Sequence, residues 1–254
     1  MTTVKQIYDF IDGIAPFSSA LEDDNVGLLV GDFQKQVQKV IVSLDINKKV
    51  INEAINEGAD LIVAHHPVIY APLSNLIPEN NAYLLASSNI SAICAHTNLD
   101  AASGGVNDVL AEKIGLNDIK GFHLPEEDID LGRVGILPEE MTINEFTSMV
   151  KDVLSAACIQ YSGSAKVKKV ALVSGAGNNY IKYAIAQGVD TFLTGETKYF
   201  SFLEAEDLGY NMVVAGHFAT ENIVIPVLKE RLEKAFPNIQ FIISRANNQL
   251  PYVV

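Results

Sequence analysis

Residues 39–66 read KVIVSLDINKKVINEAINEGADLIVAHH, and residues 169–196 read KVALVSGAGNNYIKYAIAQGVDTFLTGE. The two segments align without a gap at a constant offset of 130 residues, and seven aligned pairs are identical, among them Gly58 with Gly188 and Asp60 with Asp190. Each contains a β-branched run, an amphipathic run that ends at a glycine, and a second apolar run. This order predicts a βαβ unit in each half, with parallel strands and a right-handed connection.

The similarity continues beyond each unit. ICAHTNLD at 93–100 resembles VAGHFATE at 214–221, because each reads as a strand, a histidine, and a carboxylate four residues later. A helical pattern follows in both cases, at 106–114 and 222–235. Any two βαβ units share some of these features, but the gap-free register and the matched histidine and carboxylate favour an internal repeat.

The predicted fold class is therefore α/β, with two related lobes whose mainly parallel sheets are flanked by helices. We expect residues 1–124 to form the first lobe and 125–254 the second, with interleaving at the C-terminus left open. Amphipathic helices are expected at 4–14 and 141–157, the second capped by Thr142 with Glu145 three residues later. The polar stretch 117–130 is interpreted as a surface connector.

Composition limits the classes of function. The chain has 254 residues, 48% of them hydrophobic, and a formal charge of −13, which argues against a broad nucleic-acid-binding surface. Apolar runs are far shorter than the roughly 20 residues of a spanning helix, and the N-terminus does not resemble a secretory signal. Two cysteines do not favour a disulfide framework. The expected location is the cytoplasm, with no membrane partner.

Four of the five histidines follow predicted strands: His65 and His66 after DLIVA, His96 after ICA, and His217 after VAG. In parallel α/β sheets ligands bind beyond the carboxyl ends of the strands, so these side chains fall where sites form. A single histidine in such a place is more often structural than a ligand. Four together, with Asp100 and Glu221 at matching positions, favour a shared metal site.

A pair of first-row divalent cations needs several imidazoles and at least one bridging carboxylate. Beyond a strand end, the adjacent His65 and His66 can address two different metals. His217 and Glu221 are four residues apart at the start of a helix, so they lie on one face, and Glu221 is the natural bridge. Mixed imidazole and carboxylate sites accept zinc, iron, manganese, cobalt and nickel, which leaves the metal open.

Three further motifs carry weaker signals. Gly175-Ala176-Gly177 has the spacing to present backbone N–H groups to a phosphate, but a tight turn explains it equally. The segment 24–27, Asp-Asn-Val-Gly, reads as a turn before a short strand or as part of a pocket. Glu196 aligns with His66, which makes it a candidate proton acceptor or a support for a ligand, with a surface carboxylate as the alternative.

The motifs DNVGLLVG, AHHPVIY, AHTNLDAASGGVND, TGE and GHFATEN, in this order along the whole chain, resemble those of the YbgI-type family. Its members are described as GTP cyclohydrolase I type 2-like, and the eukaryotic ones as Ngg-interacting-factor-three-like. The resemblance implies two α/β lobes with a two-metal site in the cleft between them, and a ring-shaped homohexamer. Asp23 departs from the pattern, since an aromatic residue usually stands there.

The resemblance also implies roles for individual residues. The metal ligands would be His65, His66, Asp100, His217 and Glu221, with Glu221 bridging, while His96 and Glu196 would lie close by. Our own hypothesis is that Glu196 or His96 transfers protons.

Three hypotheses of function follow. The first is metal-assisted hydrolysis of a small nucleotide-like substrate, with GTP suggested by the family alone. The second is phosphoester hydrolysis by the same cation pair, and the third is a non-catalytic metal-binding or regulatory assembly. Neither the substrate nor turnover follows from the sequence.

Overall fold

The computed structural model describes residues 1–125, 128–248 and 251. Contacts divide these residues into two compact units, of which the first contains Met1–Leu99 with Val224–Asn248 and the second contains Asp100–Ile223. This division differs from the expected one at 124/125. The cause is strand pairing, because β5 (Asn117–Leu124) pairs with β6 (Ile129–Met141), and the late strand β11 (Gln240–Ile243) pairs with β2 (Lys39–Ser43).

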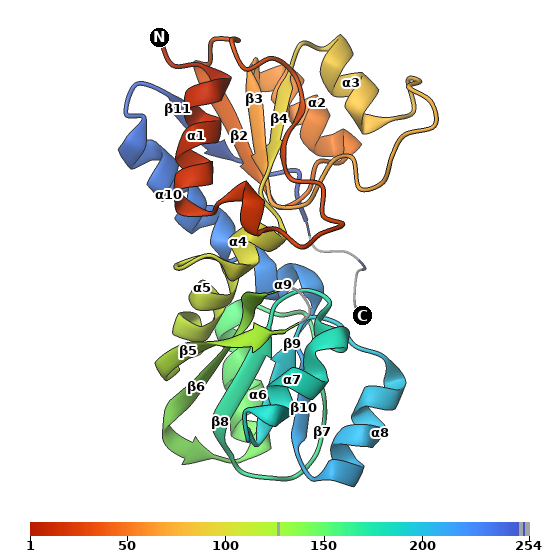
Figure 1. The fold of residues 1–254 in the computed structure, drawn as a ribbon, viewed down its shortest axis with the longest axis vertical. Helices are drawn as coiled ribbons and strands as arrows, with labels where there is room; N and C mark the ends of the chain where they lie inside the picture. The colour runs from red at the N-terminus through yellow and green to blue at the C-terminus, as the bar shows by residue number, and fades with distance from the viewer. Residues whose placement is uncertain (126–127, 249–250, 252–254) are drawn as a thin grey trace. The chain divides into compact units, whose positions relative to one another are not determined.

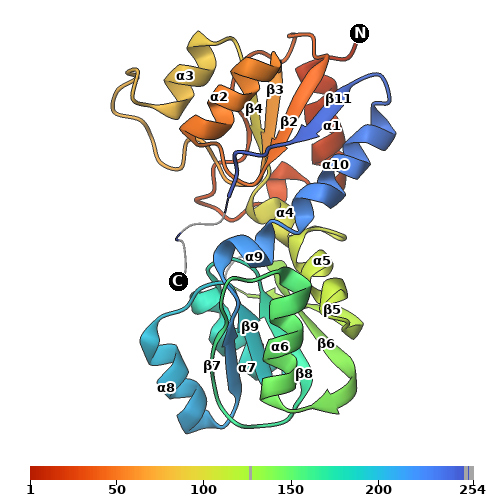
Figure 2. The same cartoon turned by 180° about the vertical axis from the view of Figure 1, so that it is seen from behind.

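The first unit is built on a five-stranded sheet with the order β1-β4-β3-β2-β11. Strands β2, β3 (Leu61–Ala64), β4 (Ser91–Cys94) and β11 are parallel, and β1 (Gly27–Val30) is antiparallel to β4. Helices α2 (Lys48–Glu57) and α3 (Asn81–Ser87) cover one face, and α1 (Val4–Ile14) and α10 (Val224–Ala235) cover the other (Figures 1 and 2). Because both faces are covered, Val40, Ile41 and Val42 are all fully buried.

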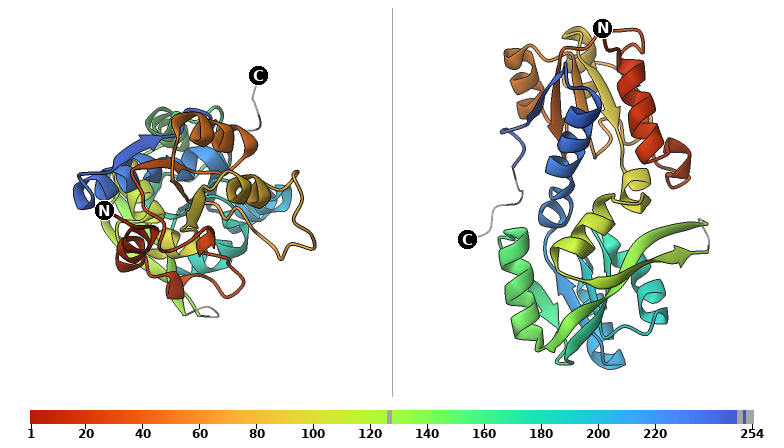
Figure 3. Two further views of the ribbon diagram at one scale, coloured as in Figure 1. Left: turned by 90° about the horizontal axis from the view of Figure 1, so that it is seen from above. Right: turned by 90° about the vertical axis from the view of Figure 1, so that its left-hand side faces the viewer.

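The second unit has a six-stranded mixed sheet with the order β5-β6-β8-β9-β10-β7. Strands β8 (Val167–Val173), β9 (Thr191–Thr194) and β10 (Asn211–Val214) are parallel, whereas β7 (Gln160–Ser162), β6 and β5 pair antiparallel. One core cluster joins the sheet to α5 (Val106–Lys113) and α6 (Ile143–Leu154). A second joins the opposite face to α7 (Ile181–Ala186) and α8 (Tyr199–Leu208), as the side view in Figure 3 also shows.

Capping side chains mark where two of the predicted helices begin. Thr142 and Glu145 form the predicted reciprocal cap of α6, with Glu145 Oε2 accepting from Thr142 N at 2.8 Å. The predicted helix at 4–14 is α1.

The prediction of a surface connector over 117–130 is wrong, because β5 and the start of β6 form a hairpin there. Most β5 side chains are exposed and only Phe122 and Leu124 are buried, so the strand carries little apolar signal.

The two βαβ segments have the same internal contacts 130 residues apart. Val40 pairs with Leu61 across β2 and β3, and Val170 pairs with Thr191 across β8 and β9. Oδ2 of Asp60 accepts from Gln38 N at 2.8 Å and Lys39 N at 3.2 Å, while Oδ2 of Asp190 accepts from Lys168 N at 3.0 Å and Lys169 N at 2.8 Å. The identical aspartates in the aligned sequences therefore fasten the starts of equivalent strands.

The predicted α/β class, with helices on both faces of each sheet, is confirmed. Among the described residues, no helix has both the length and the apolar content that crossing a bilayer requires.

Cys94 is buried and Cys158 is exposed, and both are reduced thiols. Burial raises the pKa of the Cys94 thiol to about 12, so this residue stays protonated and is a small apolar core residue rather than a nucleophile.

Candidate metal centre

Three imidazoles of the first unit lie together beyond the carboxyl ends of two neighbouring parallel strands. His65 and His66 follow β3, and His96 follows β4 two residues after its last residue. The ring centroid of His65 lies 5.0 Å from that of His66 and 5.1 Å from that of His96. One ring nitrogen of each lies within 4.8 Å of the others, a spacing suited to ligands of one cation or of a close pair.

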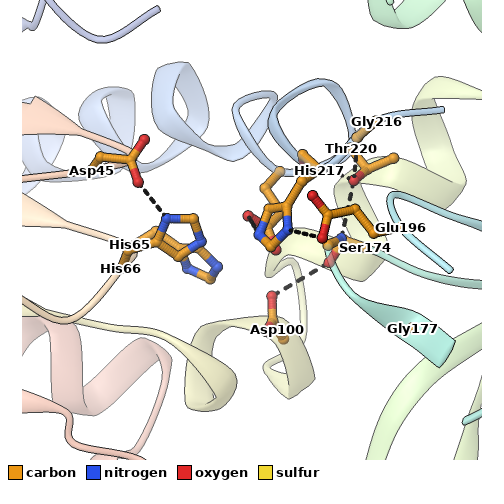
Figure 4. A network of polar contacts seen from close by, with 12 residues as sticks. Asp45, His65, His66, Asp100, Ser174, Gly177, Glu196, Gly216, His217 and Thr220 are labelled. Carbon is orange, nitrogen blue, oxygen red and sulfur yellow. Dashed lines mark hydrogen bonds and ion pairs between the residues drawn. The ribbon is translucent and has the colours of Figure 1, made fainter. Parts of the chain in front are cut away.

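Each of these imidazoles is held through Nδ1. His65 Nδ1 lies 2.9 Å from the carbonyl oxygen of Ala95, His66 Nδ1 lies 2.7 Å from Asp45 Oδ1 (Figure 4), and His96 Nδ1 lies 2.9 Å from Asp24 Oδ1. A carbonyl oxygen only accepts, so His65 Nδ1 carries the hydrogen, and the lone pair of the neutral ring is on Nε2. Carbonyl and carboxylate partners of this kind orient metal-binding histidines and make the other nitrogen more basic.

Asp24 is the better buried of the two carboxylate partners. Burial raises the pKa of its carboxyl, but hydrogen bonds from His96 and from the side chain and backbone of Thr97 outweigh that effect and leave the pKa below its usual value. Asp24 is therefore ionised at neutral pH and holds His96 in one orientation. The next residue, Asn25, donates to the carbonyl oxygen of Ile69 at 2.7 Å, so the Asp-Asn pair also fastens the chain after the two histidines.

The second unit carries a cluster centred on the short helix α9 (His217–Glu221), which follows β10. His217 Nε2 lies 3.0 Å from Glu221 Oε2, one helical turn away, and His217 Nδ1 lies 3.5 Å from Glu196 Oε2, a contact drawn in Figure 4. The side chain of Glu221 is 4% exposed, whereas that of Glu196 is 60% exposed. A buried carboxylate needs a positive partner, which a protonated imidazole or a bound cation provides.

Two glycines leave room for this cluster. Gly175 has a φ of +58°, and a Cβ there would lie 2.0 Å from Glu221 Oε1 and 3.2 Å from His217 Nε2. A Cβ on Gly195 would lie 2.6 Å from the carbonyl oxygen of Gly175 and 2.8 Å from the Cα of His217. The chain therefore requires glycine at both positions if His217 and Glu221 are to keep their places.

The backbone amides of the Gly175-Ala176-Gly177 turn are used within the protein. Gly175 N donates to Thr220 Oγ1 at 3.0 Å, and Gly177 N donates to Thr194 Oγ1 at 2.9 Å. These bonds support the interpretation of the motif as a tight turn, and they leave those two amides engaged rather than directed at a phosphate.

Asp100 lies on α4 (Thr97–Ala101) and is buried, with its side chain near a polar network of the second unit. Its Oδ1 lies 3.5 Å from Ser174 Oγ, and its carbonyl oxygen accepts from Asn107 at 3.3 Å. Arg133 is also buried and donates to the carbonyl oxygens of Ala101 and Ala102 at the end of the same helix. These contacts fix the backbone that carries Asp100.

The structure thus assembles the predicted residues into two sets. His65 and His66 stand with His96 in the first unit, and His217 stands with Glu221 and Glu196 in the second. The sequence alone does not predict Asp45, Ser174 and Thr220 as supports, nor does it give Asp24 a partner. Asp45 directly follows the strand pattern VIVSL, and Ser174 is the last residue of the pattern VALVS, so a place at a strand end is the sequence signal for both.

Comparison with known proteins identifies the family of the chain. The family model described as Duf34/NIF3 (NGG1p interacting factor 3) matches residues 2–249. Proteins named GTP cyclohydrolase 1 type 2 homolog are similar along nearly their whole lengths. The one from Clostridium perfringens is 33% identical over 95% of this chain and 96% of its own. The one from Methanocaldococcus jannaschii is 36% identical over 90% and 93%.

A solved structure extends this likeness to the fold. The crystal structure of Staphylococcus aureus protein SA1388 superposes with a TM-score of 0.90 at 27% identity, covering 100% of this chain and 99% of that one. The match of the family model over nearly the full length, together with these relatives, shows that the chain belongs to the Duf34/NIF3 (NGG1p interacting factor 3) family.

Proposed function

We propose that this protein is a metal-dependent hydrolase of a small, nucleotide-like substrate, and that it binds two divalent cations through His65, His66, Asp100, His217 and Glu221. The GTP cyclohydrolase name of the curated relatives makes GTP the first substrate to test. The observation that carries the proposal is the fixed orientation of the first unit's imidazoles through Nδ1, by Ala95, Asp45 and Asp24.

The donor set of each unit fits divalent cations. The first unit supplies oriented imidazoles, and the second supplies an imidazole with a buried carboxylate beside it. Imidazoles and carboxylates together suit zinc, iron, manganese, cobalt and nickel better than calcium or magnesium, which prefer oxygen ligands alone. Glu221 is the proposed bridging ligand, since it is the more buried of the two carboxylates beside His217.

Bound cations would supply an activated water and stabilise the negative charge that develops on the substrate. Glu196 is the first proposed proton acceptor, and the support for this role is that its exposed carboxylate lies 3.5 Å from His217 Nδ1. His96 is the second proposed proton-transfer group, and Asp24 Oδ1 holds its ring in one orientation through Nδ1 at 2.9 Å. For GTP, the expected reaction opens the imidazole ring of the purine by hydrolysis and releases formate.

The experiment is a turnover assay on protein loaded separately with each of the five metals. GTP consumption with formate release would support a cyclohydrolase, and cleavage of bis-p-nitrophenyl phosphate would support phosphoester hydrolysis. Glu196→Gln should lower kcat about 10²- to 10⁴-fold without loss of metal. The exposed Glu204→Gln is the matched control in the same unit and should retain activity.

Two results would count against this proposal. The first is tight metal binding with no turnover of nucleotides or phosphodiesters, which would favour a non-catalytic metal-binding assembly. The second is turnover that persists undiminished after chelation, both in the unaltered protein and in Glu221→Ala, since the activity would then not depend on the metal.

We further propose that the protein acts in the cytoplasm as a homohexamer, as the family resemblance implies, and that the two βαβ segments derive from one duplicated unit. Light scattering on the purified chain tests the assembly, and a monomer at micromolar concentration would contradict it.

A further inference from the structure

Asn107 is a fully buried asparagine near the start of α5, and both ends of its amide bond to the main chain. Its Nδ2 donates to the carbonyl oxygen of Leu131 at 3.0 Å and to that of Asp100 at 3.3 Å, and its Oδ1 accepts from Ser174 N at 2.8 Å. A buried carboxamide is costly unless it makes such bonds. This one side chain therefore holds three segments of the second unit in place.

Two of these segments also meet through side chains. Ser174 Oγ lies 3.5 Å from Asp100 Oδ1, a contact drawn in Figure 4, and both residues are buried. Asn107 binds the main chain of both partners in this contact. The position of the proposed ligand Asp100 therefore depends on Asn107 twice, once through its own carbonyl group and once through Ser174.

The segment held through Ser174 leads to the second carboxylate ligand. Ser174 is followed by Gly175, whose N–H donates to Thr220 Oγ1 at 3.0 Å. Thr220 precedes Glu221, and Glu221 Oε1 lies in the space that Gly175 leaves by having no Cβ. A shift of the main chain at Ser174 would therefore reach both Thr220 and Glu221.

We infer that Asn107 is a positioning residue of the candidate metal centre. It joins the main chain of Asp100 to the turn that places Glu221, although these two carboxylates are 121 residues apart (221 − 100). The inference rests on the metal ligands named in the proposed function. It adds a residue that acts through both carboxylates rather than as a ligand, because its amide is engaged with the main chain.

The same unit contains a matched control for this role. Asn211 is also fully buried, and its Nδ2 also donates twice, to the carbonyl oxygen of Ala165 at 3.0 Å and to Thr191 Oγ1 at 3.1 Å. Asn211 is the first residue of β10, so it lies at the opposite end of the strand from the one that leads to His217. Substitutions of Asn211 should therefore reduce stability, as those of Asn107 do, without reaching the metal ligands.

The test is the zinc affinity of the full-length protein, measured by competition with a chromogenic chelator, together with the visible absorption spectrum of its cobalt(II) form. Asn107→Ala should weaken zinc binding about 10- to 100-fold. It should also change the cobalt spectrum, which reports the geometry of the ligands. Asn107→Asp keeps the size of the side chain and an oxygen that accepts from Ser174 N, but it lacks the N–H donors and should change both readouts in the same direction.

Asn211→Ala and Asn211→Asp should bind zinc as the unaltered protein does and give the same cobalt spectrum. Urea unfolding should show a comparable loss of stability in the Asn107 and Asn211 variants. If Asn107→Ala does not fold, the comparison of Asn107→Asp with Asn211→Asp decides the question.

Zinc affinity and cobalt spectra that are unchanged in the Asn107 variants would overturn the inference. Equal changes in the Asn211 variants would also overturn it, since lost stability alone would then be the cause. Weaker metal binding in the Asn107 variants of a protein that turns over no substrate would support the inference and contradict the hydrolase. Turnover with unaltered metal binding in these variants would do the reverse, and a protein that binds neither zinc nor cobalt would contradict both.

Discussion

Nε2 of His217 lies 3.0 Å from Oε2 of Glu221, one helical turn further along α9, and the carboxylate is almost fully buried. The short helix alone does not place this pair. It depends on the turn at Gly175, whose missing side chain leaves the space that Glu221 Oε1 occupies. The first prediction follows from that dependence.

Gly175→Ala should displace the carboxylate of Glu221 and reduce the amount of bound metal while leaving the fold intact. Gly188→Ala is the matched control, because Gly188 has a φ of +64°, close to the +58° of Gly175, but nothing within 4 Å of a new Cβ. Both variants should lose about 1–2 kcal/mol of stability from backbone strain. Metal analysis should separate them, and equal metal content in the two variants would contradict the account.

Asp45→Ala should weaken metal binding about 10- to 100-fold, because it removes the carboxylate that orients His66. Competition with a chromogenic chelator measures the change. Glu79→Ala, which removes an exposed carboxylate from the same unit, should bind metal as the unaltered protein does. If the two variants have the same affinity, Asp45 does not support a ligand.

Glu53 gives a prediction about pH. Burial raises the pKa of its carboxyl, but hydrogen bonds from Ser244, Arg245 and Ala246 outweigh this effect and lower the pKa below 4.5. A group whose pKa is lower in the folded state stabilises the protein above its ordinary pKa, and this contribution disappears as the pH falls through the folded value. Glu53→Ala should therefore lower Tm at about pH 7, and the difference should shrink below about pH 4.

Thermal unfolding of both proteins over that pH range is the measurement. A Tm difference that stays constant, or grows, on acidification would show that the ionised carboxylate is not what holds the segment after β11.

Asp60→Ala and Asp190→Ala should destabilise the protein to a similar extent, by about 1–3 kcal/mol each, since each aspartate accepts from two backbone amides at the start of an equivalent strand. Urea unfolding measures both, with exposed Asp152→Ala as the control. If only one of the two variants has a lower free energy of unfolding, the two aspartates do not contribute equally to stability.

The sequence predicts those parts of the fold whose signals are local. The cap of α6 needs only Thr142 and Glu145, and the strands β2, β3, β8 and β9 are marked by continuous apolar runs. The sequence does not predict β5, because six of its eight residues are not buried and the strand shows no clear period of two. β11 pairs with β2 across 201 residues of sequence (240 − 39), a pairing that no local pattern specifies.

The candidate site shows the same limit. The sequence predicts the histidines because each follows a strand pattern, whereas their supports come from distant segments. Asp24 precedes His96 by 72 residues and Asp45 precedes His66 by 21, so only the folded chain shows these pairs. The sequence predicts a turn at Gly175, but the effect of Gly175 on Glu221 depends on a contact across 46 residues (221 − 175).

Metal content of the freshly purified protein, measured beside a His65→Ala, His66→Ala double variant, tests the central claim most directly. The account predicts about two divalent cations per chain in the unaltered protein and a clear loss in the variant, with the fold of both verified by circular dichroism. Equal metal content in the two proteins, or none in the unaltered protein after incubation with zinc, iron, manganese, cobalt and nickel in turn, would contradict it.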